Sequence, residues 1–161
     1  MEPLEPPALH QAQAAYGWLE LGNVEEAFAE LQRLPEELQL LPAVQAVRLD
    51  RLMAAKDWNA AVKLAQVLCG QWAEEPGLWL HHAYAARRCA GGSIEAAYEL
   101  LAPCVERFPE EWLIPYNVAC YLCQMERLDE ARAMLEMARA KGGERVDTMA
   151  KDDEDLAPLN L

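Results

Sequence analysis

The sequence predicts an all-α fold: a solenoid of antiparallel helix pairs with about four repeats and a short C-terminal capping helix. Two observations support this prediction. Hydrophobic residues make up 53% of the 161 residues and charged residues 25%, and the abundance of alanine and leucine favours helices around a buried core. Four similar segments also recur at nearly constant spacing. A chain of this length is expected to form a single domain, residues 1–161.

The repeat is visible as an apolar residue three positions before an alanine. The four aligned alanines are Ala27, Ala61, Ala97 and Ala131, which lie 34, 36 and 34 residues apart. Such a period is long enough for two helices and two turns. Three of the segments begin with a residue that favours the N-cap of a helix: Asn23, Asp57 and Ser93.

Glycines and prolines between the segments give the expected helix boundaries. We expect helices over residues 8–21, 24–34, 42–56, 58–72, 76–90, 93–108, 111–125 and 128–140. These helices pair into repeats over residues 8–35, 42–74, 76–108 and 111–142, followed by a C-terminal cap or tail over 144–161. Residues 36–41 are expected to form an irregular bridge after Pro35. An acidic tail without structure is the alternative for 144–161, and Leu156 and Leu159 favour the cap.

The fourth repeat has the most characteristic residues. Its segments Tyr116-Asn117-Val118-Ala119-Cys120-Tyr121 and Leu128-Asp129-Glu130-Ala131-Arg132 resemble the tetratricopeptide repeat (TPR) of small bacterial proteins. The resemblance covers about residues 8–142 and is weaker in the first two repeats, where Lys56 replaces a small turn residue. It implies a protein-binding groove lined by the first helix of each pair. The lysine and asparagine that bind chaperone C-terminal tails in some relatives are here Ala12 and Tyr16, so a co-chaperone of that kind is not expected.

By this resemblance and by helical spacing, the groove is expected to hold residues from four helices. The expected helices over residues 8–21 and 42–56 would contribute Gln13, Tyr16, Glu20, Ala46, Asp50 and Met53. The expected helices over residues 76–90 and 111–125 would contribute His81, Tyr84, Arg87, Arg88, Tyr116, Asn117, Cys120 and Gln124.

Arg87 and Arg88 form a basic spot in an acidic chain. They are interpreted either as a clamp for a partner's carboxylate or as cations that neutralise nearby glutamates at a helix C-terminus. The tyrosines in the expected groove are interpreted either as contact residues for a partner or as ordinary helix packing.

No catalytic site, metal site or cofactor is expected. Cys120 and Cys123 form a C-x-x-C pair without the strand–loop–helix context of redox motifs or a second pair for zinc, so packing explains them best. His81 and His82 are adjacent and therefore point to different faces of a helix. No phosphate-binding loop or nucleophile elbow is present in the sequence, and the protein is not expected to be an enzyme.

The net charge of −13 disfavours nucleic acid and anionic membranes and would attract a basic partner. Five cysteines and an acidic, proline-rich start without signal-peptide character suggest a reducing cytoplasm. The expected function is therefore a protein-interaction module or adaptor that binds a peptide or helix of a partner. The alternative is a dedicated chaperone for a secreted protein, similar to class II chaperones of type III secretion. Homodimer formation stays open.

Overall fold

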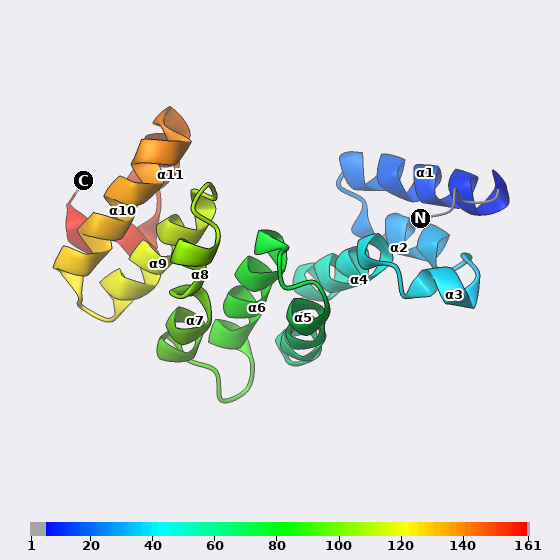
Figure 1. Cartoon of the computed structure of the whole chain (residues 1–161), viewed down its shortest axis with the longest axis horizontal. Coiled ribbons are helices and arrows are strands. Elements are labelled where there is room, and N and C mark those ends of the chain that lie inside the picture. The colour runs from blue at the N-terminus through cyan, green and yellow to red at the C-terminus, as the bar shows by residue number, and fades with distance from the viewer. Residues whose placement is uncertain (1–5, 161) are drawn as a thin grey trace.

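The computed structural model describes residues 6–160 and consists of helices that follow one another along an elongated, curved molecule (Figure 1). The acidic, proline-rich start at residues 1–5 lies outside the described range. The α-helices are α1 Pro6–Glu20, α2 Val24–Leu31, α3 Glu36–Gln39, α4 Pro42–Ala54, α5 Trp58–Gln71, α6 Pro76–Arg88, α7 Ile94–Leu101, α8 Cys104–Arg107, α9 Leu113–Gln124, α10 Leu128–Gly142 and α11 Glu144–Lys151. A 3₁₀ helix, η1 (Glu154–Leu159), ends the described chain.

The fold confirms the predicted solenoid of helix pairs. Four pairs succeed one another as α1–α2, α4–α5, α6–α7 and α9–α10, and each pair also packs on the next one. Ala27, Ala61, Ala97 and Ala131 are all completely buried, one in the second helix of each pair. A methyl group at these positions allows the two helices of a pair to approach closely.

Side-chain caps fix the start of three second helices, as the sequence predicted. Asn23, Asp57 and Ser93 each accept a hydrogen bond from the backbone N–H three residues later, at 3.1–3.2 Å. These bonds satisfy one of the unpaired donors at each helix start.

A left-handed residue forms the corner between the two helices of each pair. In the first and third pairs it is a glycine, with φ of 72° at Gly22 and 75° at Gly91. In the second and fourth pairs it is Lys56 (φ 55°) and Glu126 (φ 60°). The backbone conformation is therefore repeated in all four corners even where the side chain departs from the small residue that favours it.

Several helix boundaries differ from the sequence-based expectation, and α2, expected to reach residue 34, already ends at Leu31. The helix expected over residues 93–108 is broken into α7 and α8, because Pro103 lacks an N–H and its ring cannot fit inside a continuous helix. The expected irregular bridge contains the short helix α3, which begins directly after Pro35. Gln39 at its end donates to the carbonyls of Leu31 and Leu34, at 2.7 and 3.0 Å, and so ties the bridge to the first repeat.

The C-terminal segment is ordered and packs on the last pair. Helix α11 turns back against α10, and η1 then lies against α9 and α10. Leu156 and Leu159 are buried in the same apolar cluster as α9 and α10. The segment therefore caps the stack, which is the outcome that the two leucines favoured.

Candidate protein-binding groove

We call the surface formed by the first helices of the pairs, α1, α4, α6 and α9, the groove face. All the residues expected in the groove lie on these four helices, but their surroundings differ. Gln13, Tyr16 and Glu20 of α1 are exposed, and the Tyr16 side chain is 64% exposed. Asp50, His81 and Asn117 are partly buried, whereas Tyr116 is buried. Asn117 uses its side-chain amide to donate to the Leu113 carbonyl at 2.8 Å.

An open cleft of about 330 Å³ lies between α4 and α6. The first turns of α4 and the first turns of α6 form its walls, and Trp72 and Glu75 also line it. Its lining residues are Pro42, Ala43, Ala46, Asp50, Trp72, Glu75, Gly77, Leu78 and His81. Small residues on both helices leave space between them, so the cleft can accept an apolar side chain from outside.

Asp50 provides a half-buried carboxylate at this cleft. Burial raises its pKa above the ordinary value, and the nearby His81 opposes that rise. The distance from His81 Nε2 to Asp50 Oδ1 is 3.7 Å, which is too long for a hydrogen bond. Within residues 6–160 this imidazole, which is charged only when protonated, is the one basic group in ion-pair range of Asp50, and no lysine or arginine forms an ion pair with the carboxylate.

Arg88, the last residue of α6, does not line the cleft and lies in an aromatic cluster with Tyr84 and Trp58. Its guanidinium lies 3.5 Å from the centroid of the Tyr84 ring and 5.8 Å from that of Trp58. The two rings meet edge-on with centroids 5.8 Å apart. Over the described part of the chain Arg88 forms no ion pair, and its one hydrogen bond goes to the Tyr84 carbonyl at 3.2 Å. Stacking therefore positions this cation without neutralising it.

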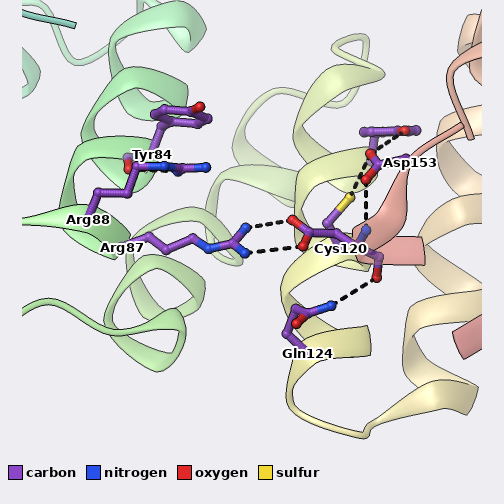
Figure 2. Close-up of polar contacts among 8 residues, drawn as sticks. Tyr84, Arg87, Arg88, Cys120, Gln124 and Asp153 are labelled. Atoms are coloured by element: carbon purple, nitrogen blue, oxygen red, sulfur yellow. Dashed lines mark hydrogen bonds and ion pairs between the residues drawn. The ribbon is translucent and has the colours of Figure 1, made fainter. Parts of the chain in front are cut away.

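Arg87 has a different role from its neighbour, because it reaches across to the C-terminal segment (Figure 2). Its guanidinium binds both carboxylate oxygens of Asp155, at 2.6 and 3.1 Å. Both side chains are mostly buried, and this fork geometry is the stronger form of an ion pair. A carboxylate clamp was one of the two interpretations of Arg87 and Arg88 from the sequence; in the structure a carboxylate of the chain itself, that of Asp155, is bound to Arg87.

Three polar groups of α9 on this face also contact the C-terminal segment. The Tyr116 hydroxyl donates to Asp153 at 2.7 Å, and the Cys120 thiol lies 3.7 Å from the same carboxylate oxygen. Gln124 donates to the Asp155 carbonyl at 3.3 Å (Figure 2). Burial and the neighbouring carboxylates raise the pKa of the Tyr116 hydroxyl and of the Cys120 thiol, so both stay protonated.

The groove face is thus divided into two parts. Its α4–α6 part is open, and its α6–α9 part is covered by residues 153–159. The sequence did not identify Trp72, which lines the cleft, or the two tail aspartates, which cover the rest of the face. The acidic run at 152–155 was visible, but nothing in its pattern indicated which helix would receive it.

Chemistry other than binding has little support in the described residues. No group of three or more metal-ligating side chains that could hold an ion occurs within residues 6–160. The thiols of Cys120 and Cys123 are buried, and burial raises both pKa values, which opposes formation of a nucleophilic thiolate. No helix in this range is long and apolar enough to cross a membrane.

The fold and its groove face define a TPR-like helical repeat. A search of protein-family models found no match, and no curated protein matches the sequence. Among solved structures, the chain is similar to "MamA MSR-1 C2", a TPR protein, with a TM-score of 0.64 over 97% of this chain and 94% of that chain. The identity is 13%, so this likeness concerns the fold.

Proposed function

We propose that the protein is an interaction module that binds a peptide or helix of a partner protein at the open cleft between α4 and α6. The observation that supports this proposal is the cleft itself: an apolar opening of about 330 Å³ beside a half-buried carboxylate. A TPR-like fold without an evident catalytic constellation among the described residues is consistent with a binding role rather than an enzymatic one.

The residues around the cleft indicate which partner would fit. Ala43, Ala46 and Leu78 offer apolar contact for one side chain. Asp50 lacks a close cation, and a lysine or arginine of the partner would supply one. A basic segment would also be attracted by the net charge of −13, which repels nucleic acid and anionic membranes. We therefore expect a partner segment with an apolar anchor next to a basic residue.

Two variants of the full chain test this assignment. Asp50→Asn removes the charge, and Ala46→Phe fills the cleft. Their matched controls are Glu110→Gln, an exposed carboxylate in another turn, and Ala54→Phe, an exposed position of the same helix α4. Partners are first captured from a lysate of the source organism with the wild-type protein, and the affinity of each captured protein is then measured with all five forms.

The proposal predicts that Asp50→Asn and Ala46→Phe each weaken binding at least about tenfold, while both controls bind like the wild type. A partner that binds all five forms equally would place the binding surface elsewhere and refute the proposal.

The fold alone does not separate an adaptor from a dedicated chaperone. A chaperone similar to the class II proteins of type III secretion would keep its substrate soluble on co-expression, whereas an adaptor would leave the partner's solubility unchanged. Exposed apolar surface for self-association is provided by Tyr16 and Leu21 in the first repeat and by Leu40 in the bridge that follows it. Light scattering of the purified chain would measure whether the protein self-associates.

A further inference from the structure

We propose that the α6–α9 part of the groove face is a second peptide-binding site, specific for a short acidic segment followed by leucines. Residues 153–159 occupy this site as a built-in ligand, and a partner segment of the same chemistry binds there by displacing them. This inference concerns a different surface and a ligand of opposite charge from the cleft between α4 and α6, so the two proposals stand or fall separately.

The polar half of the site consists of side chains from two helices that converge on one short segment. Arg87 of α6 binds the Asp155 carboxylate in a fork, and Gln124 of α9 donates to the backbone carbonyl of the same residue. Tyr116 donates to Asp153 at 2.7 Å. The groove face thus binds two carboxylates that are two residues apart in the tail, and one backbone carbonyl of the same segment.

The apolar half of the site takes the two leucines. Leu156 is 1% exposed and Leu159 is 4% exposed, and both belong to the cluster formed mainly by α9 and α10. Arg132 of α10 also approaches the Leu159 carbonyl at 3.4 Å. The recognised pattern is therefore Asp-x-Asp-Leu-x-x-Leu, with its first carboxylate on α9, its second on α6 and its leucines on α9 and α10.

The bound segment has the properties of a ligand rather than of another helix pair. It is a 3₁₀ helix of six residues, and side chains of the repeats bind its carboxylate and that of its N-cap residue Asp153. An acidic segment on a protein of net charge −13 needs such specific donors, because the general field repels it. The short connection from α11 gives the tail an effective concentration in the millimolar range, so it occupies the site until a tighter or more concentrated competitor arrives.

A synthetic peptide of residues 152–160 with an N-terminal fluorophore tests the site by fluorescence polarisation against the full chain. In the wild type the tail competes with the peptide. Asp155→Asn removes the tail's own ion pair with Arg87, whereas the peptide keeps its aspartate. The peptide should therefore bind the Asp155→Asn protein at least about tenfold more tightly than it binds the wild type. Glu154→Gln is the matched control, because Glu154 is exposed and makes no hydrogen bond or ion pair with the described residues, and it should behave like the wild type.

The receptor side is tested in the Asp155→Asn background, where the peptide alone uses Arg87. Adding Arg87→Gln should weaken the peptide at least about tenfold, whereas Arg88→Gln, which removes the neighbouring cation that the tail does not contact, should leave the affinity unchanged. A peptide in which asparagine replaces both Asp153 and Asp155 should bind at least about tenfold more weakly than the unchanged peptide. Asp50→Asn should have no effect, which separates this site from the open cleft.

Helical circular dichroism and the melting temperature establish that each variant is folded. Should Asp155→Asn disturb folding, Leu159→Ala weakens the tail through its apolar contact and must raise the peptide's affinity in the same direction. The proposal is overturned if Asp155→Asn and Glu154→Gln bind the peptide equally, if Arg87→Gln and Arg88→Gln have the same effect, or if the neutral peptide binds as well as the acidic one.

Discussion

Leu156 gives the most direct test that the C-terminal segment is packed on the repeats in solution. Its side chain is 1% exposed within the cluster around α9 and α10. Leu156→Ala removes buried methyl groups and leaves a gap, and such changes in cores cost about 2–5 kcal/mol. We expect the lower part of that range, about 2–3 kcal/mol, because a segment at the end of the stack relaxes into the gap more easily than a central helix.

For a chain of this length, each kcal/mol lowers the melting temperature by about 2–4 °C, so Leu156→Ala should lower it by roughly 4–12 °C. The control is Leu40→Ala, because the Leu40 side chain is 73% exposed, and it should change stability by less than about 0.5 kcal/mol. Hydrogen exchange adds a local measure. The amides of Leu156 and Asn160, which donate to the carbonyls of Asp153 and Ala157, should lose protection in Leu156→Ala before the amides of α9 do.

Equal melting temperatures for Leu156→Ala and Leu40→Ala would refute this reasoning. So would an unprotected tail in the wild type, since a segment that exchanges freely does not cover the groove face.

Three further predictions concern the turn between α6 and α7, one buried histidine and the thiols. Gly92→Ala should destabilise the protein by about 3 kcal/mol, the upper end for overpacked sites, because the new Cβ would lie 2.1 Å from the Ala86 carbonyl oxygen. Gly70→Ala in α5 has free space around the new Cβ, and denaturant titrations should show that it stabilises the protein by about 0.4–1 kcal/mol. Burial lowers the pKa of His82 below its ordinary value of 6.5, so the stability contributed by the neutral imidazole is complete above pH 6.5 and is lost as the pH falls. We would measure the free energy of unfolding of the wild type and of His82→Leu between pH 5 and 7. On going to lower pH, the wild type should lose up to about 1.4 kcal/mol per pH unit more than the variant. A thiol reagent followed by mass spectrometry should modify the half-buried Cys89 first, and equal labelling of all thiols in the folded protein would contradict the observed packing. The four protected thiols are expected to be Cys69, Cys104, Cys120 and Cys123.

The sequence alone determined the helix pairs, because their signals are local. An N-cap such as Asn23 and a small residue such as Ala27 act on the few residues around them, so their spacing is readable along the chain. The break at Pro103 was readable by the same rule, yet the expected helix ran through it. The corner at Lys56 shows the reverse case, where packing of two helices imposes a left-handed backbone that the residue type does not favour.

The tertiary structure alone decided what the groove face contains. The sequence placed Arg87 and Arg88 side by side, and nothing in it distinguished them. Asp155 is 68 residues from Arg87 along the chain, and the two meet only because the solenoid brings α6, α9 and the tail together. Helical periodicity specifies which face of a helix a side chain lies on. A contact between distant segments depends instead on how all the repeats between them stack, and the sequence of a single repeat does not determine that stacking.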